Sequence, residues 1–185
     1  GNNVVRYAYD GKRRLKTMEL NGVKNYVQYG YAETKDSDGS VVKETVTTAY
    51  ASKDKYISEK DGNGNLLKLT ANNVVQLENI YDKKGQLCTL KDKVVSKNYK
   101  FECDDFDNIT VIYEADENGI QVSNGYGESV EYDDLGSIKK RTIVGPVSQV
   151  YDYTYKTDST HALESITVNG STIKPKLDVL GRNKG

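Results

Sequence analysis

The sequence predicts an all-β fold, an array of consecutive antiparallel β-hairpins forming an extended, curved or spiralling open sheet. Three observations predict it. An Asp followed three residues later by Gly recurs along the chain, which is the preference of a type I turn. Asn-Gly pairs stand between other segments, and Asn-Gly is the strongest signal for a two-residue hairpin turn. The segments between these turns alternate with the period of a strand, and no window carries a convincing helical stripe.

The stretch IYDKKGQLCTLKD, residues 80–92, shows one such turn in full. Asp82 stands at the first position of the expected turn, and Gly85 at the fourth, where Gly takes a positive φ without steric cost. The Asp side chain can accept a hydrogen bond from the backbone two residues on. Tyr81 precedes the turn and Leu87 follows it, so the stretch predicts a β-hairpin.

The same pattern marks a repeat along the whole chain. Its Asp and Gly pairs are Asp36/Gly39, Asp61/Gly64, Asp82/Gly85, Asp116/Gly119, Asp133/Gly136 and Asp178/Gly181. An aliphatic residue lies five positions after most of these Asp residues, and also after Asp10, Asp104 and Asp158, where Arg13, Asp107 and His161 replace the Gly. Markers at positions 10, 36, 61, 82, 104, 133, 158 and 178 predict one array, 1–185, of about eight units of 20 to 29 residues. Such a unit accommodates two strands and two turns.

The second turn of a unit is visible in several places. Asn21-Gly22 and Asn169-Gly170 predict type I′ turns, and Asn124-Gly125 is expected to play the same part in the long 104–133 unit. NNVVRYAYD at 2–10 and NNVVQLENIYD at 72–82 are similar lead-in strands. Strand alternation is clearest at Tyr99, Phe101 and Cys103, and at Tyr151, Tyr153 and Tyr155. The 15 Tyr residues with 2 Phe and no Trp suit a sheet with one apolar and one wet face.

With these turns established, the chain resembles the YD repeat, also called the Rhs repeat, of bacterial Rhs and wall-associated proteins, toxin-complex shell proteins and teneurins. The matching segments are YDKKGQL (81–87), YDDLGSI (132–138) and LDVLGR (177–182), with CDDFDNI (103–109) and KDGNGNL (60–66) as degenerate copies. The resemblance implies a sheet of hairpins that, in large members, spirals into a shell around a passenger or cavity. Tyr is replaced at Lys35, Lys60, Cys103, Thr157 and Leu177. The repeat-turn residues expected to be structural are Asp36, Gly39, Asp61, Gly64, Tyr81, Asp82, Gly85, Tyr132, Asp133, Gly136, Asp178 and Gly181.

We expect the chain to be a segment of a longer protein, because it starts at Gly1 and its last unit stops just after its turn. No apolar run approaches the roughly 18 residues of a membrane span. The resemblance implies a secreted or cell-surface bacterial protein. The expected partners are neighbouring repeats or domains of the parent protein, and unpaired edge strands also predict an edge-to-edge homodimer.

Charge and cysteine content exclude several classes of partner. The chain carries 26 basic and 27 acidic side chains, so we expect no nucleic-acid binding. The basic runs 11–16 and 139–141 lie beside turns and are interpreted as solvated. Cys88 and Cys103 are too few for a disulfide scaffold and lack metal-ligand spacing, and no cofactor is expected.

We expect no enzyme activity. The single histidine, His161, stands at a turn position that favours positive φ, which explains it better than a catalytic base does. Paired carboxylates fall where the turn already requires Asp. Segments 36–40 and 61–65 alternate oxygen ligands as a calcium loop would, but both lack its remaining ligands, including the Glu at position twelve.

Two functions remain open. The first is a non-enzymatic structural repeat segment of a β-shell or stalk. The alternative is a carbohydrate or cell-surface binding module whose exposed aromatic rows stack on sugar rings; these rows are Tyr26, Tyr29 and Tyr31, and Tyr151, Tyr153 and Tyr155. The two differ in where the Tyr rows lie, buried for structure or exposed on an open face for a ligand.

Overall fold

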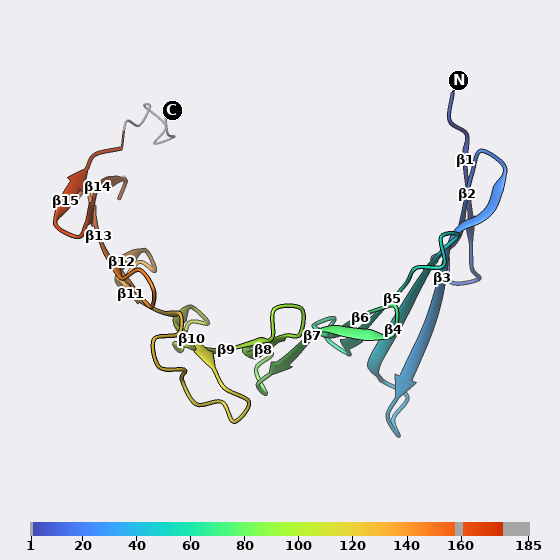
Figure 1. Ribbon diagram of the computed structural model, residues 1–185, viewed down its shortest axis with the longest axis horizontal. Coiled ribbons are helices and arrows are strands. Elements are labelled where there is room, and N and C mark those ends of the chain that lie inside the picture. The colour runs from blue at the N-terminus through green and yellow to red at the C-terminus, as the bar shows by residue number, and fades with distance from the viewer. Residues whose placement is uncertain (1, 158–160, 176–185) are drawn as a thin grey trace. The chain divides into compact units, whose positions relative to one another are not determined.

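The computed structural model describes residues 2–157 and 161–175, and within these ranges it contains strands and turns but no helix. Fifteen strands are described, and neighbours within a unit pair antiparallel in sequence order. The chain divides into two compact units, Gly1–Lys97 and Asn98–Gly185 (Figure 1). The predicted all-β open sheet of antiparallel hairpins is confirmed in both units.

The first unit holds eight strands. They are β1 (Val5–Tyr9), β2 (Leu15–Leu20), β3 (Val23–Lys35), β4 (Val41–Tyr50), β5 (Lys55–Asp61), β6 (Leu66–Ala71), β7 (Val74–Tyr81) and β8 (Leu87–Asp92). The second unit holds β9 (Lys97–Cys103, beginning at the boundary residue), β10 (Ile109–Ala115), β11 (Gly127–Tyr132), β12 (Ile138–Val144), β13 (Gln149–Tyr155), β14 (Leu163–Val168) and β15 (Ser171–Ile173). Successive turns lie alternately at the two edges of each unit. The Asp turns that join the strands of a hairpin lie at one edge, and the connections between hairpins lie at the opposite edge.

The Asp turns have the geometry that the sequence predicts. In the turn between β7 and β8, the Gly85 N–H donates to the Asp82 carbonyl at 3.1 Å, and Gly85 has a φ of 85°. The Asp82 Oδ1 accepts the N–H groups of Lys84 at 2.8 Å and Gln86 at 2.9 Å. This is a type I turn followed by a left-handed residue, the usual three-residue hairpin loop. The same bonds recur at Asp10, Asp36, Asp61, Asp104, Asp116 and Asp133, whereas Asp178 and Gly181 lie outside the described residues.

The spacing between Tyr and Leu in the motif follows from this loop. Tyr81 and Leu87 are cross-strand partners, with a register shift between Ile80 and Tyr81. Tyr132 and Ile138 pair in the same way. The left-handed residue forms a bulge that adds one residue to the returning strand. The aliphatic residue five positions after the Asp is therefore the partner of the residue before it.

The repeat continues where Gly is absent because the substitutes adopt the same backbone conformation. Arg13, Asp107 and His161 have φ values of 62°, 68° and 44°. The interpretation of His161 as a turn residue with positive φ is therefore confirmed. Each such non-Gly residue occupies a region that L side chains rarely adopt.

The opposite edge carries the Asn turns. Asn21 and Gly22 both have positive φ, at 49° and 82°, as do Asn169 and Gly170, at 47° and 86°, which is the type I′ geometry. Asn72-Asn73 forms a third such turn, at 48° and 67°, that the sequence analysis did not single out.

The long 104–133 unit differs at this edge. Asn124 has a φ of 58°, but Gly125 does not share the left-handed conformation, and its N–H donates to the Val122 carbonyl at 3.0 Å. The prediction that Asn124-Gly125 forms the same kind of turn as Asn21-Gly22 is therefore wrong. The Asp116 turn is an additional loop on this edge, which explains why Asp116 lies off the period of the other markers.

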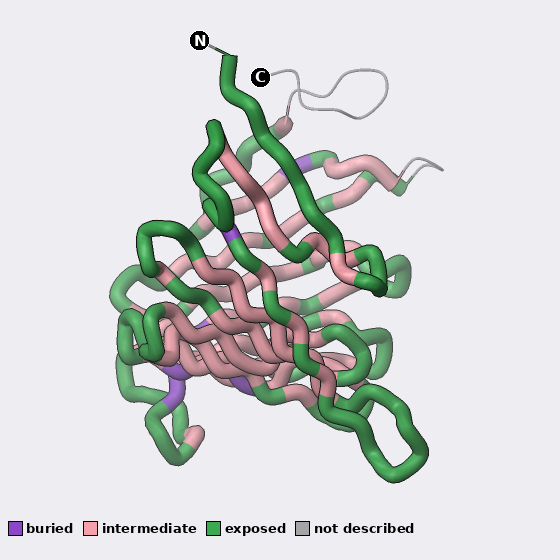
Figure 2. The backbone as a smooth tube through the Cα atoms, turned by 90° about the vertical axis from the view of Figure 1, so that its right-hand side faces the viewer, coloured by how far each residue is buried: buried purple, intermediate pink, exposed green. Residues whose placement is uncertain are grey.

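Both units bury little. Val27 and Ala115 are the buried hydrophobic residues of the described chain, and most strand residues are half-buried while the turns are exposed (Figure 2). Alternation is clear in β3 and β13, but all six residues of β6 are half-buried. The expected division into one apolar face and one solvent-exposed face therefore holds for only some strands. In the other strands, side chains on both faces of the sheet partly cover their neighbours from solvent.

Candidate functional site

Tyrosine hydroxyls connect neighbouring hairpins at the Asp-turn edge. In the first unit, Tyr31 donates to the Leu15 carbonyl at 2.9 Å, and Tyr81 donates to the Leu66 carbonyl at 3.0 Å. In the second unit, Tyr132 donates to Ile109 and Tyr155 to Ile138, both at 2.9 Å. Every acceptor is the aliphatic residue that follows the preceding Asp turn. We call each of these four bonds a Tyr staple.

The staples lie where adjacent hairpins separate. The pairing of β10 with β11 runs from Tyr113 to Val111 and does not reach Ile109. The pairing of β12 with β13 likewise ends at Lys140, two residues after Ile138. A carbonyl beyond the end of the ladder needs another donor, and the Tyr hydroxyl supplies it. We call the space beyond the ladder a notch and number the notches by their tyrosines, Tyr31, Tyr81, Tyr132 and Tyr155, as first to fourth.

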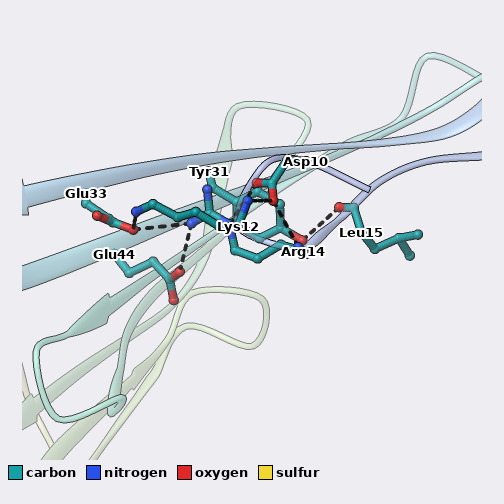
Figure 3. Close-up of polar contacts among 7 residues, drawn as sticks. All are labelled: Asp10, Lys12, Arg14, Leu15, Tyr31, Glu33 and Glu44. Atoms are coloured by element: carbon teal, nitrogen blue, oxygen red, sulfur yellow. Dashed lines mark hydrogen bonds and ion pairs between the residues drawn. The ribbon is translucent and has the colours of Figure 1, made fainter. Parts of the chain in front are cut away.

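The first notch is filled by a charged cluster (Figure 3). The Arg14 guanidinium lies 4.1 Å from the centre of the Tyr31 ring. Its Nε donates to Asp10 Oδ2 at 2.9 Å, and an Nη donates to Glu33 Oε1 at 3.2 Å. Lys12 also donates to Glu33, at 2.7 Å. Arginine suits this place because its planar group stacks on an aromatic face and binds carboxylates at its rim.

The electrostatics of the cluster follow from these contacts. The pKa of Asp10 is lowered, chiefly because its carboxylate accepts the backbone N–H of Arg14. The pKa of Glu33 is lowered by the hydrogen bond from Lys12, and the pKa of Arg14 is raised by its bond to Asp10. Both carboxylates therefore remain ionised at neutral pH, and none is suited to accept a proton there.

The fourth notch is filled by histidine. The His161 ring stacks on the Tyr155 ring with centroids 4.7 Å apart and 14° between the planes, and its Nε2 lies 3.0 Å from Asp133 Oδ2. The pKa of Asp133 is lowered, first by the backbone N–H of Ser137 and also by His161. Tyr155 pairs with Leu163, so the loop is two residues longer than at Tyr81 and Leu87. The sequence analysis had placed Thr157 in the Tyr position, which is wrong for this reason.

The cation–π contacts found among the described residues involve Tyr31 and Tyr151, not the tyrosines of the second and third notches. In the second, the Asn79 amide donates to the Leu66 carbonyl at 2.9 Å beside Tyr81. The third opens into a hollow of about 810 Å³ around Tyr132. Its lining also includes Phe106 and Leu135, which stand at the tips of the two flanking turns.

The predicted Tyr rows fall into two groups. Tyr29 and Tyr31 alternate in register with the buried Val27, whereas Tyr26, 38% exposed, points to the other face of β3 by strand alternation. Tyr151, Tyr153 and Tyr155 share one face of β13 and are half-buried. Tyr31 and Tyr155 form staples, and Tyr151 donates to Gln149 Oε1. Tyr151, Tyr153 and Tyr155 therefore form one row, as predicted. Tyr26 does not belong to the same row as Tyr29 and Tyr31.

A second ionic cluster includes Arg141, and the interpretation of the basic run 139–141 as solvated is wrong for this residue, which is half-buried and pairs with Glu128. Arg141 Nε and Nη2 donate to the two carboxylate oxygens of Glu128 at 2.7 and 2.9 Å, and Tyr126 donates to Glu128 as well. The Glu128 side chain is 9% exposed, and its pKa is lowered chiefly by Arg141. Burial and Glu128 raise the pKa of Tyr126. The interacting residues are 13 positions apart on β11 and β12, so no motif marks them.

The remaining candidate groups serve the turns. The carboxylate oxygens of Asp61 accept the N–H groups of Asn63 and Asn65 and the Asn65 amide, so this side chain serves its own turn. Cys88 and Cys103 are half-buried, and neither forms a disulfide within the described residues. In the described ranges, no group of three or more His, Cys, Asp or Glu side chains could hold a metal ion. The same ranges contain no helix long and apolar enough to cross a membrane.

Several solved structures have a fold similar to that of this chain. The crystal structure of TcdB2-TccC3-Cdc42 matches 95% of this chain at a TM-score of 0.63 and 14% identity. The structures of TcdB2-TccC3, and of TcdB2-TccC3 without its hypervariable C-terminal region, match with TM-scores of 0.61 and 0.60 at 13% and 12% identity. This chain spans about 10% of the length of the chains it matches. No family model and no curated protein matches the sequence. The likeness supports a fold like that of the Rhs or YD repeats.

Proposed function

We propose that this chain is a non-enzymatic structural segment of a larger secreted or cell-surface protein, in which its hairpins form part of a β-shell wall. The observation that carries the proposal is the set of four Tyr staples. Tyr81 and Tyr132, the tyrosines of the repeat motif, and Tyr31 and Tyr155, which lie farther from their turn Asp, all donate to backbone carbonyls of the preceding hairpin. A tyrosine that donates to the preceding hairpin helps to fix the position of one hairpin against the next.

Three further features support a structural role over a catalytic one. The Asp side chains accept hydrogen bonds within their own turns. His161 stacks on a staple tyrosine and bonds to a turn carboxylate, so it helps to seal a notch. The likeness to long chains of which this one covers about a tenth favours a wall segment within a larger assembly. The encapsulating role, the bacterial source and the extracellular location belong to this proposal.

Two measurements test it. Antibodies raised against this chain should detect, in the source organism, a protein much larger than 20.6 kDa. A native protein of 20.6 kDa would refute the segment proposal. A glycan array probed with the full chain and with Tyr153→Ala tests the alternative function. We expect no binding, and reproducible binding that is lost in the folded variant would favour the carbohydrate-binding module.

A further inference from the structure

The four Tyr staples share one register. At each of them, the last ladder pair before the notch joins the residue two positions after the staple acceptor to the residue three positions before the tyrosine. These pairs are Thr17 with Gln28, Lys68 with Glu78, Val111 with Ser129 and Lys140 with Asp152. The corresponding tyrosines and acceptors are Tyr31 and Leu15, Tyr81 and Leu66, Tyr132 and Ile109, and Tyr155 and Ile138. The interface between two stapled hairpins is therefore one recurring geometry, although its side chains differ.

Tyr9 has the same place relative to its turn as a staple tyrosine. It directly precedes the turn aspartate and pairs with Leu15 beside a register shift, as Tyr81 pairs with Leu87. None of the staple bonds in the described chain starts from Tyr9, and its side chain is 61% exposed, whereas Tyr81 is half-buried. Tyr9 is therefore a staple donor whose acceptor is not supplied by the described residues.

The free side of β1 offers a strand-pairing surface beside this hydroxyl. Within the described chain β1 is the end strand of the first unit and pairs with β2 alone, so the backbone groups on its other side are open to a ladder (Figure 1). Val5, Tyr7 and Tyr9 share one face of β1 by strand alternation, and they are 40%, 54% and 61% exposed. An antiparallel strand beside β1 would cover this apolar row as well as the backbone.

The sequence that leads into β1 is that of a hairpin turn. Residues 2–5, Asn-Asn-Val-Val, repeat residues 72–75, and Asn72-Asn73 forms the type I′ turn that leads from β6 into β7. The strand before that turn, β6, carries the acceptor of the Tyr81 staple, Leu66. β1 thus has the sequence of the second strand of such a pair, which is an observation independent of Tyr9.

We propose that the free side of β1 is a docking site for another Asp-turn hairpin of the larger protein. The strand that follows the Asp turn of that hairpin pairs antiparallel with β1, and the Tyr9 hydroxyl donates to the carbonyl of its aliphatic residue. The residue two positions after this aliphatic residue lies opposite Arg6, because Arg6 lies three positions before Tyr9. A second copy of this chain is not the occupant, because the strands that carry the staple acceptors already pair on both sides; these are β2, β6, β10 and β12. The source of the hairpin rests on the proposed function, whereas the geometry follows from the four staples.

An extended chain tests this geometry. A copy of residues 97–113, which contains β9, the Asp104 turn and the start of β10, is placed directly before Asn2. With Asn2-Asn3 as a two-residue turn, Val111 of the copy lies opposite Arg6, and the Ile109 carbonyl of the copy is the acceptor for Tyr9. We expect the outward-facing amide N–H groups of β1 to exchange with solvent at least about tenfold more slowly than in the unextended chain. Cross-strand nuclear Overhauser contacts should join Arg6 to Val111 of the copy.

Tyr9→Phe isolates the new staple, because it removes the hydroxyl and keeps the ring. Tyr7→Phe is the matched control, since Tyr7 lies on the same face of the same strand and is also exposed. In the unextended chain both variants should leave the urea midpoint unchanged. In the extended chain Tyr9→Phe should lower the midpoint by about 0.5 M, whereas Tyr7→Phe should not. Circular dichroism verifies the fold of each variant.

Several results would overturn the docking site. They are unchanged exchange of the β1 amides in the extended chain, a different residue of the copy opposite Arg6, and a midpoint change in Tyr9→Phe that is equal in both chains or equal to that in Tyr7→Phe. Dimers of the unextended chain that protect the β1 amides would identify a second copy as the occupant instead. A native protein of 20.6 kDa would refute the proposed function without changing these measurements. A much larger native protein together with any of these results would refute the docking site alone.

Discussion

Tyr155→Phe removes one hydroxyl and keeps the ring, so it isolates the staple between β12 and β13. The Tyr155 hydroxyl donates to the Ile138 carbonyl at 2.9 Å, beyond the last ladder pair of these strands. Phe retains the stacking on His161. The net cost of losing such a bond, with a half-buried carbonyl left unsatisfied, is about 1 kcal/mol. With a urea dependence of about 2 kcal/mol per molar, the midpoint should fall by about 0.5 M.

Two comparisons make the test specific. Tyr153→Phe is the matched control, because Tyr153 lies on the same face of the same strand and its hydroxyl bonds to no described residue. It should leave the midpoint unchanged. Tyr81→Phe should cost less than half as much as Tyr155→Phe, since the Asn79 amide also donates to the Leu66 carbonyl. Urea unfolding followed by far-ultraviolet circular dichroism measures all three. Equal losses in Tyr153→Phe and Tyr155→Phe would refute the staple reasoning.

Other perturbations test the turns and their charges. Asp82→Ala removes the acceptor of two backbone N–H groups and should lower the free energy of unfolding by about 1 kcal/mol, with Lys83→Ala unchanged as its control in urea titrations. Gly62→Ala would place a Cβ 2.2 Å from the Val41 carbonyl oxygen and should cost about 2 kcal/mol. Gly11→Ala, with no atom within 4 Å of its Cβ, should be neutral. The carboxyls of Asp10, Asp61, Asp104 and Asp133 have folded pKa values below their ordinary ones, chiefly because they accept hydrogen bonds. Their stabilisation is therefore present above about pH 4 and lost as the pH falls further, so the melting temperature should be flat from pH 7 to 5 and decline below pH 4. A melting temperature that rises below pH 4 would contradict this reasoning.

The turns could be predicted because their chemistry is local. Asp82 and Gly85 form hydrogen bonds with backbone groups within five residues. The turn geometry can therefore be predicted from these two residue types and their spacing. The hydroxyl partner of Tyr132 could not be predicted, because the acceptor is the backbone carbonyl of Ile109, 23 positions away, and a carbonyl carries no residue identity.

The notches were missed for a related reason. Whether a notch is filled depends on which side chains meet across two repeats, and the loop length decides that. Between β13 and β14, Tyr155 rather than Thr157 pairs with Leu163, and His161 lies against Asp133. Phe106 and Leu135, both exposed at separate turn tips, line the hollow around Tyr132. Turn chemistry in the sequence specifies neither outcome.

The Tyr staples all run in one direction, from a later hairpin to an earlier one, and this gives the array a chemical polarity. At the opposite edge the direction is reversed, because Asn21, Asn72 and Asn169 accept the N–H groups of the earlier residues Val4, Lys55 and Val150. An edge strand facing earlier repeats therefore offers a phenol donor, as Tyr9 does at 61% exposure. An edge facing later repeats offers a carbonyl acceptor. Unlike edges satisfy each other, whereas like edges leave both groups unmatched. Association through the staple is thus heterologous and open-ended, and an isologous pair of like edges gains nothing from it.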